Sequence, residues 1–155
     1  MKQVPLNRQV MESRLREIAV DIEKLKKFEN LSFPEFDKEE NFAIAEHYLR
    51  RALEAVFDIG NHILSRFPIP PGERPTMYKE IALALGKYNI VPFDFAQNAL
   101  KNMAGYRNRL VHFYYEVTKK EFLEIIQKNL KNLENFCSYI TKLMDHPEDY
   151  GLKIT

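Results

Sequence analysis

Cysteine and long apolar runs are both scarce in this sequence, and their scarcity excludes several classes of protein. Cys137 is the single cysteine among 155 residues, so the chain can form neither an internal disulfide nor a cysteine-based metal cluster. No apolar segment follows the first residues, as it would in a signal peptide, and no apolar run reaches the roughly 18 residues of a membrane-spanning helix. We therefore expect a protein of the reducing cytoplasm that is not exported and does not span a membrane.

An excess of charge of either sign is also missing. The sequence has 23 Lys and Arg residues against 22 Asp and Glu residues, which gives a formal net charge of +1. No overall basic field therefore attracts nucleic acid, and any nucleic-acid site must be a local patch. With 45% hydrophobic and 29% charged residues, residues 1–155 are expected to form a single globular domain with its own core.

Helical periodicity is what the sequence does contain, from one end to the other. Apolar residues recur at alternating three- and four-residue steps, and no strand-like alternation or internal repeat competes with this pattern. Pro34 ends the first helix because a proline disfavours helical geometry in the residue before it. The proline-rich residues 68–75 form an irregular connection. The predicted helices begin and end near residues 6–30, 37–67, 76–87, 92–113 and 119–146. The predicted fold class is therefore all-α.

The start of the last predicted helix carries a capping signal. The Thr118 hydroxyl can accept a hydrogen bond from the amide of Glu121, while the Glu121 carboxylate reaches back to the start of the helix. An apolar stripe follows and ends before Pro147. Cys137 falls on this stripe, so we expect it in the core.

Residues 105–117 hold the least ordinary side chains of the sequence. Arg107 and Asn108 are followed by His112 and Tyr114, which puts a phosphate-binding cation, a proton shuttle and a reactive hydroxyl within one helical stretch. Imidazole is the side chain that most readily changes its charge near neutral pH. This combination suits phosphodiester chemistry.

Helical geometry does not bring the whole set together. At about 100° per residue, Asn108 and His112 share one face, whereas Arg107 and His112 are separated by roughly 140°. Either the helix unwinds near Tyr115, or two copies of the chain combine their motifs across a two-fold axis, as closed dimers do. We favour the dimer.

The Arg107-Asn108-x-Leu-Val-His112-x-Tyr114 string, with Met103-Ala104-Gly105 before it and Val117 after it, resembles the HepT-like ribonuclease toxins of the HEPN superfamily. Residues 52–63 resemble the central helix of that family and residues 77–81 its following element. The similarity therefore covers most of the chain beyond the N-terminal helix. It implies an antiparallel bundle of four or five helices, a homodimer, and RNA cleavage at a composite site without a metal or another cofactor.

The same resemblance implies control by an antitoxin. In this family the partner is a minimal nucleotidyltransferase that silences the toxin by adding nucleotide to the motif tyrosine, here Tyr114. The implied role of His112 is to accept a proton from an RNA 2′-hydroxyl or to give one to the leaving oxygen. Arg107 would offer its planar fork to the phosphate oxygens, and Asn108 would orient His112 or a phosphate. Arg109 is a candidate for contact with the RNA backbone.

One further histidine is a candidate site residue. Glu54, Asp58, His62 and Arg66 recur at four-residue spacing, which is typical of an exposed, ion-paired helix face. His62 is kept as a candidate substrate-binding residue beside this simpler interpretation. No spacing of histidines and carboxylates fits a metal site.

A second function class stays open on the sequence. The same bundle can serve as a non-catalytic subunit that binds substrate or partner for a minimal nucleotidyltransferase, because a fold does not dictate an activity. The set of Arg107, Asn108 and His112 separates the two classes, since a binding subunit would not require it. We therefore expect the ribonuclease.

Overall fold

The computed structural model describes residues 3–112 and 117–155, and in these ranges the regular structure is helical. Five helices have ten or more residues, which confirms the predicted all-α bundle. The helices are α1 (Arg8–Lys26), α2 (Phe33–Phe36), α3 (Glu39–Leu64), α4 (Tyr78–Lys87), α5 (Phe93–Phe95), a π-helical turn (Ala96–Leu100), α6 (Lys101–His112), α7 (Lys119–Asp145) and a 3-10 turn (Pro147–Tyr150). None of them is both long and apolar enough to cross a membrane, within the described ranges.

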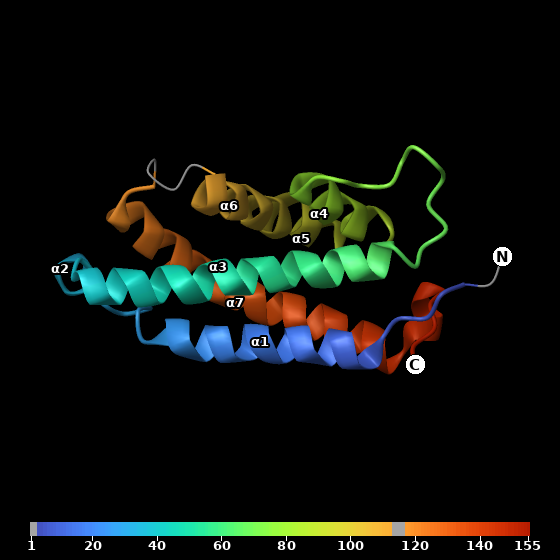
Figure 1. Cartoon of the computed structure of the whole chain (residues 1–155), viewed down its shortest axis with the longest axis horizontal. Coiled ribbons are helices and arrows are strands. Elements are labelled where there is room, and N and C mark those ends of the chain that lie inside the picture. Colours follow the sequence, from blue (N-terminus) through green and yellow to red (C-terminus); the bar gives the residue numbers. More distant parts are fainter. Residues whose placement is uncertain (1–2, 113–116) are drawn as a thin grey trace.

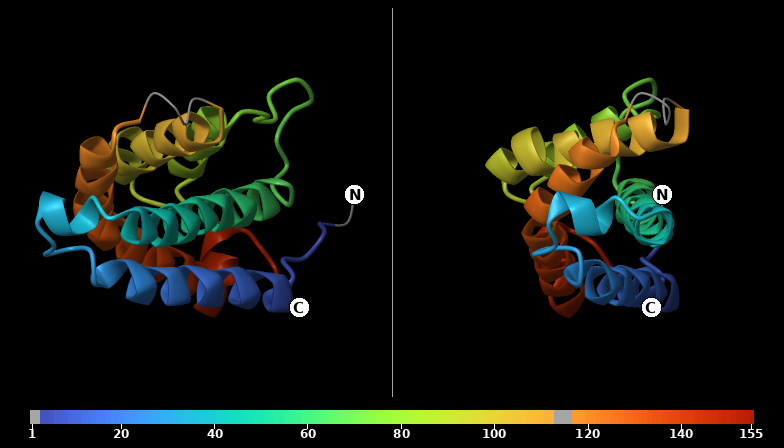
Figure 2. Two further views of the ribbon diagram at one scale, coloured as in Figure 1. Left: turned by 60° about the vertical axis from the view of Figure 1, so that its left-hand side comes forward. Right: turned by 90° about the vertical axis from the view of Figure 1, so that its left-hand side faces the viewer.

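The bundle has two parts that share α3. Helices α1, α3 and α7 run side by side, with α3 and α7 directed opposite to α1, while α4, α5 and α6 lie on the far side of α3 from α1 (Figure 1). The views in Figure 2 show the same stacking. Helix α3 therefore contacts both parts.

Leu6, just before α1, pairs with the last residues of the chain. The Leu6 amide donates to the Lys153 carbonyl at 2.7 Å, and the Thr155 amide donates to the Leu6 carbonyl at 2.9 Å.

The predicted apolar stripes form the core. Their side chains become inaccessible to water because each helix turns its stripe toward α3 or α7, and this burial is the main favourable contribution to folding. Fully or nearly fully buried members of the predicted stripes are Ile18, Ile22, Leu25, Ala45, Leu49, Ala52, Val56, Ile59, Ile63, Phe122, Ile126, Leu130, Leu133, Ile140 and Met144.

The predicted break around Pro34 contains a short helix of its own. Pro34 lies in the first turn of α2, where its missing amide donor costs nothing. The turn places Phe36 at 0% exposure, with its ring 5.7 Å from that of Phe28 and 6.4 Å from that of Phe122. Asp37, at which the second predicted helix begins, instead ends α2 by donating its amide to the Phe33 carbonyl. Helix α3 therefore begins two residues later than predicted.

Capping by side chains determines where α1 and α7 begin. The Asn7 side chain accepts from the Val10 amide at 3.1 Å, and the Thr118 hydroxyl accepts from the Glu121 amide at 3.1 Å. These bonds satisfy amide donors that have no partner within the helix. The predicted cap at Thr118 is confirmed.

Candidate catalytic site at the end of α6

The candidate site is built on the last turns of α6. This helix carries Arg107, Asn108 and Arg109, ends at His112, and packs against both α3 and α4. Tyr114, the predicted target of modification, lies outside the described residues. The geometry of the site is therefore that of Arg107, its neighbours and His112.

Arg107 is held from three directions. Its Nε donates to Glu54 Oε1 of α3 at 2.9 Å, and its Nη1 donates to Asn108 Oδ1 at 3.4 Å. Its Cζ lies 4.0 Å from the ring centroid of Tyr78, the first residue of α4. Only 13% of the Arg107 side chain is exposed, and a guanidinium this covered needs a charged partner. Glu54 supplies that partner.

The sequence interpretation missed the role of Glu54. It placed Glu54 and Asp58 on an ion-paired face of one helix, but both carboxylates pair with arginines of other helices. Glu54 binds Arg107 of α6, and Asp58 Oδ2 lies 3.4 Å from Arg14 Nε of α1. Burial raises the pKa of Asp58, nearby Glu54 raises it further, and Arg14 and Arg107 oppose the rise. The sequence feature that could have revealed this role is the pair of carboxylates, Glu54 and Asp58, beside buried positions of the central helix.

Arg107 and His112 differ in their surroundings. Arg107 faces α3 and α4, whereas His112 is exposed at the last position of α6. Five residues of helix separate them by roughly 7.5 Å along the axis. Their difference in exposure agrees with the predicted angular separation of the two side chains. Asn108 lies one turn before His112 and contacts Arg107.

Arg109 connects α6 to α7. Its Nη1 and Nη2 donate to Oε1 and Oε2 of Glu121 at 2.6 and 3.0 Å, a two-pronged ion pair. This hydrogen bonding to Arg109 lowers the pKa of the Glu121 carboxyl, with a smaller contribution from the Thr118 backbone. The pair joins the helices on either side of residues 113–116. Contact between Arg109 and RNA stays a prediction.

His62 lies about two turns along α3 from Glu54, at roughly 12 Å. Its Nε2 accepts from the backbone amide of Asn7, the N-cap of α1, at 3.1 Å. Burial lowers the pKa of His62, and the charge of Arg66 lowers it further, so the neutral acceptor form is favoured. The structure thus uses His62 to fix the N-terminal segment, and substrate binding by His62 stays a prediction.

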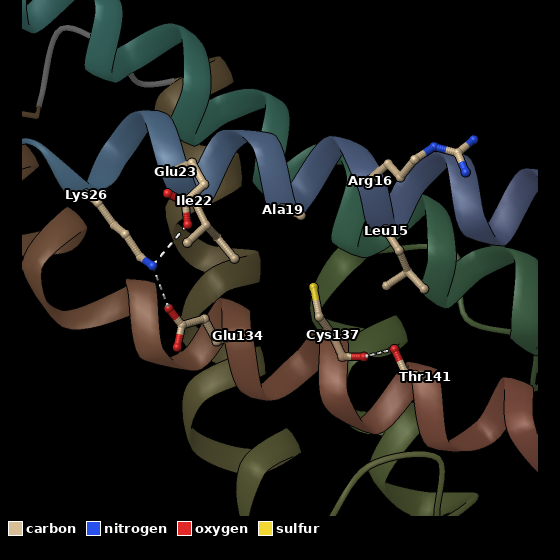
Figure 3. Close-up of a pocket in the computed structure, with 9 residues that line it drawn as sticks. All are labelled: Leu15, Arg16, Ala19, Ile22, Glu23, Lys26, Glu134, Cys137 and Thr141. Carbon is tan, nitrogen blue, oxygen red and sulfur yellow. Dashed lines mark hydrogen bonds and ion pairs between the residues drawn. The ribbon is translucent and has the colours of Figure 1, made fainter.

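Cys137 packs against the core as predicted but is only partly buried, because it also lines an open pocket between α1 and α7 (Figure 3). The pocket has a volume of about 420 Å³. Figure 3 shows the thiol directed toward α1, with Lys26 bridging Glu23 and Glu134 at one end of the pocket. Partial burial raises the pKa of Cys137 to about 11, so the thiol is protonated at neutral pH. The pocket is lined by Leu15, Arg16, Ala19, Ile22, Glu23, Lys26, Glu134, Cys137 and Thr141, none of them from α6.

Among the described residues, metal-binding side chains do not gather at the end of α6. In residues 3–112 and 117–155, no group of three or more His, Cys, Asp or Glu residues is arranged to hold a metal ion. The chemistry of the described site is that of a guanidinium, an amide and an imidazole.

Known proteins resemble the chain in sequence. The family model described as ribonuclease HepT-like matches residues 18–140. A tRNA nuclease HepT of Aphanizomenon flos-aquae is 36% identical over 136 residues, which are 87% of this chain and 90% of the relative. An mRNA nuclease HepT of Shewanella oneidensis is 32% identical over 94 residues, which are 59% of this chain and 66% of the relative.

Solved structures share the fold. A tri-AMPylated HEPN toxin of Shewanella oneidensis, in complex with an MNT antitoxin, superposes with a TM-score of 0.73 at 23% identity and covers 86% of this chain and 97% of its own. The Bacillus subtilis protein YutE, described as a cytosolic protein of unknown function, superposes with a TM-score of 0.70 at 20% identity over 88% of this chain and 92% of its own.

Proposed function

This chain belongs to the HepT-like ribonuclease family, and from that premise we propose that it is an endoribonuclease toxin whose catalytic groups are Arg107, Asn108 and His112. The observation that carries the proposal is the fixed guanidinium of Arg107 on the same helix end as the exposed imidazole of His112. A cationic fork and a proton shuttle are what phosphodiester cleavage requires. Cytoplasmic RNA is the proposed substrate class.

The reaction follows from these groups. His112 accepts the proton of an RNA 2′-hydroxyl, whose oxygen attacks the adjacent phosphorus. The bond from phosphorus to the 5′-oxygen breaks, and the leaving oxygen takes a proton from an imidazolium or from water. Arg107 stabilises the charge that builds on the phosphate oxygens. The products are a 2′,3′-cyclic phosphate and a 5′-hydroxyl, and the route uses no metal ion.

Glu54 and Asn108 act on Arg107 in this scheme. The carboxylate of Glu54 binds the Nε edge, and the amide oxygen of Asn108 lies 3.4 Å from Nη1. Both contacts restrict the long side chain before RNA binds, which lowers the entropy lost when the phosphate is bound. Both are therefore positioning contacts for Arg107, and Asn108 in addition orients His112 or the phosphate as a member of the catalytic set.

A homodimer completes the site in this proposal. Arg107 is covered by α3 and α4 while His112 is exposed at the end of α6, so we propose that Arg107 of one copy works with the partner subunit's His112. Closed two-fold dimers place the same surface of both copies at the contact. Two equivalent sites would then form.

Control by a minimal nucleotidyltransferase antitoxin is part of the proposal. The Shewanella oneidensis HEPN toxin with the same fold is tri-AMPylated and bound to an MNT antitoxin, which supports a similar partner here. Tyr114 lies two positions after His112. An adenylyl group on its hydroxyl would bring bulk and a negative phosphate to the place where the RNA phosphate binds, so both sterics and charge would oppose substrate binding.

The experiment is an RNA cleavage assay on purified protein with EDTA present. We expect cleavage with 2′,3′-cyclic phosphate ends, and a loss of about 10²- to 10⁴-fold in His112→Ala with the circular dichroism spectrum unchanged. Arg107→Lys should also lose RNA cleavage, because lysine keeps the positive charge but lacks the planar fork of donors of the guanidinium. Equal rates in both variants and the parent would exclude this site, and absence of cleavage by the parent would favour a non-catalytic binding subunit.

A further inference from the structure

Tyr78 is a side chain that the proposed chemistry does not yet use. It is the first residue of α4, and Arg107 lies over its ring, with the guanidinium carbon 4.0 Å from the ring centroid. We propose that Tyr78 is a positioning residue for RNA cleavage, whose ring fixes the plane of the Arg107 guanidinium and so aims its Nη atoms at the scissile phosphate. The inference rests on the proposed function, because it concerns the same site.

The ring of Tyr78 is itself fixed by the core. It packs edge-on against Phe57 of α3, with 5.2 Å between the ring centroids and 70° between the ring planes. Phe57 is 1% exposed. A rotation of the Tyr78 ring away from Arg107 would therefore break a favourable aromatic pair at the edge of the core.

The backbone of Tyr78 is fixed by the cap of α4. The Glu80 carboxylate accepts hydrogen bonds from the amides of Thr76 at 2.9 Å and Met77 at 3.3 Å. These bonds favour the ionised carboxylate and lower the pKa of Glu80 below its ordinary value of 4.5. Because Tyr78 directly follows Met77, the cap sets where α4 starts and where the ring lies.

The ring and Glu54 restrict different motions of Arg107. The hydrogen bond from Nε to Glu54 holds one edge of the guanidinium but permits the group to tilt about that edge. The guanidinium carbon lies over the ring, and a cation over an aromatic face is attracted to it. Tilt decides whether a planar fork meets two phosphate oxygens or one. With both contacts in place, the Nη edge keeps one direction.

The test compares two substitutions that differ in the aromatic face. Tyr78→Phe keeps the ring, and we expect its kcat to stay within about 2-fold of the parent. Tyr78→Leu keeps an apolar side chain without the ring, and its kcat should fall by roughly 3- to 30-fold, with a smaller change in KM. Tyr88→Leu is the matched control, since Tyr88 also packs on a phenylalanine and lies under a lysine ammonium at the other end of α4. It should cut RNA as the parent does.

A second measurement separates positioning from a structural role. The Arg107 Hε resonance in a 15N-resolved NMR spectrum, assigned by its loss in Arg107→Lys, should carry an upfield ring-current shift. The shift should persist in Tyr78→Phe and disappear in Tyr78→Leu. In an Arg107→Ala background, single-turnover cleavage should be no slower with Tyr78→Leu added, because the group that the ring positions is gone.

Several results of these experiments would contradict the role of the Tyr78 ring. An equal kcat loss in Tyr78→Phe, an unshifted Hε resonance in the parent, or an undiminished effect of Tyr78→Leu without Arg107 would overturn the role of the ring while leaving the nuclease intact. Arg107→Ala cleaving as fast as the parent, or a parent that cuts no RNA, would instead overturn the proposed function and the inference with it.

Discussion

Glu54 decides how Arg107 can act, although its own charge opposes the binding of an RNA phosphate. In Glu54→Gln the ion pair at Nε becomes a weaker hydrogen bond from the Arg107 cation to a neutral amide oxygen, so Arg107 is less restricted. We expect kcat to fall by roughly 5- to 30-fold and KM not to rise, because a negative charge beside the phosphate site has been removed. Steady-state cleavage of a short RNA measures both constants.

Asp58→Asn is the matched control for Glu54. Asp58 lies one turn further along α3 and pairs with Arg14 of α1 instead of with α6. Its substitution should leave kcat within about 3-fold of the parent, as an exposed pair contributes little. An equal kcat loss in both variants would mean that cleavage depends on the overall negative charge of α3 and does not depend on the specific contact between Glu54 and Arg107.

Tyr114 carries the prediction on control. Tyr114→Phe has nearly the same shape without the acceptor oxygen, so it should retain much of its cleavage activity and escape silencing when co-expressed with a cognate nucleotidyltransferase. Intact-mass measurement after co-expression detects each added nucleotide. A mass increase that persists in Tyr114→Phe would place the modification elsewhere, and an unmodified but inhibited parent would indicate inhibition by binding alone.

At the scale of helices, Gly86 permits the close approach of α4 to the π-helical turn that leads into α6. A Cβ at Gly86 would lie 2.5 Å from the Cβ of Ala96. Gly86→Ala should therefore destabilise the protein by about 1–3 kcal/mol through overpacking, measured by urea unfolding. Gly105→Ala is the control, because a Cβ at Gly105 would lie 3.9 Å from its nearest neighbour. This substitution should stabilise α6 by about 0.5 kcal/mol or more.

A second substitution tests the cause of the Gly86 effect. Adding Ala96→Gly to Gly86→Ala removes the opposing methyl group, so the double variant should be more stable than the sum of the two single changes by about 1 kcal/mol or more. Additive behaviour would show that the two Cβ positions do not determine the spacing of α4 and the π-helical turn.

The contact between α1 and α3 contains a buried carboxylate with a predictable pH response. Asp21 is 0% exposed, and its Oδ1 accepts from Nε and Nη2 of Arg51 at 2.8 and 2.5 Å. Its Oδ2 has no hydrogen-bond partner among the described residues. Burial raises the pKa of Asp21 above its ordinary value of 3.8, and Arg51 only partly opposes this rise.

The direction in which stability changes with pH follows from the protons bound by the folded and unfolded chains. Between pH 3.8 and the raised pKa the folded chain holds a proton on Asp21 that the unfolded chain has released, so the contribution of Asp21 to stability falls as the pH rises through this window. The unfolding free energy of the parent minus that of Asp21→Asn should fall with rising pH and then level off. A difference that grows with pH would mean that the attraction of Arg51 outweighs burial.

At the scale of the whole molecule, the proposed dimer predicts complementation between two inactive variants. If each site combines Arg107 of one copy with the partner subunit's His112, a mixed dimer of Arg107→Ala and His112→Ala contains one intact site. Random re-association of equal amounts should restore about one quarter of the parent activity, because half of the dimers are mixed and each has one good site of two.

The complementation test requires exchange of subunits and a dimer at the assay concentration. Sedimentation velocity of the parent at micromolar concentration should give the mass of two copies. A monomer that cleaves RNA, or a dimer whose mixed variants stay inactive after exchange, would contradict a site shared in this way.

Much of the bundle was determined by the sequence alone. Three- and four-residue apolar steps identify α1, α3 and α7, and Thr118 identifies the start of α7, because periodicity and capping act between residues that are near one another in the chain. The same local spacing predicted Arg107 and His112 on one helix at different angles. It also predicted Cys137 in the core, but tertiary packing leaves this side chain only partly buried, at the edge of the core beside an open pocket.

Only the tertiary structure decided which side chains surround Arg107. Glu54 is 53 positions away in the chain, and Tyr78 belongs to a third helix. No local pattern encodes such contacts, since they depend on the packing of α6 against α3 and α4, which the spacing of residues within one helix does not specify. Likewise, local spacing suggested that Asp58 would pair along α3, but the neighbouring α1 offers it Arg14. A helix fixes the angle at which a charge points, and the packing of helices fixes the partner that it meets.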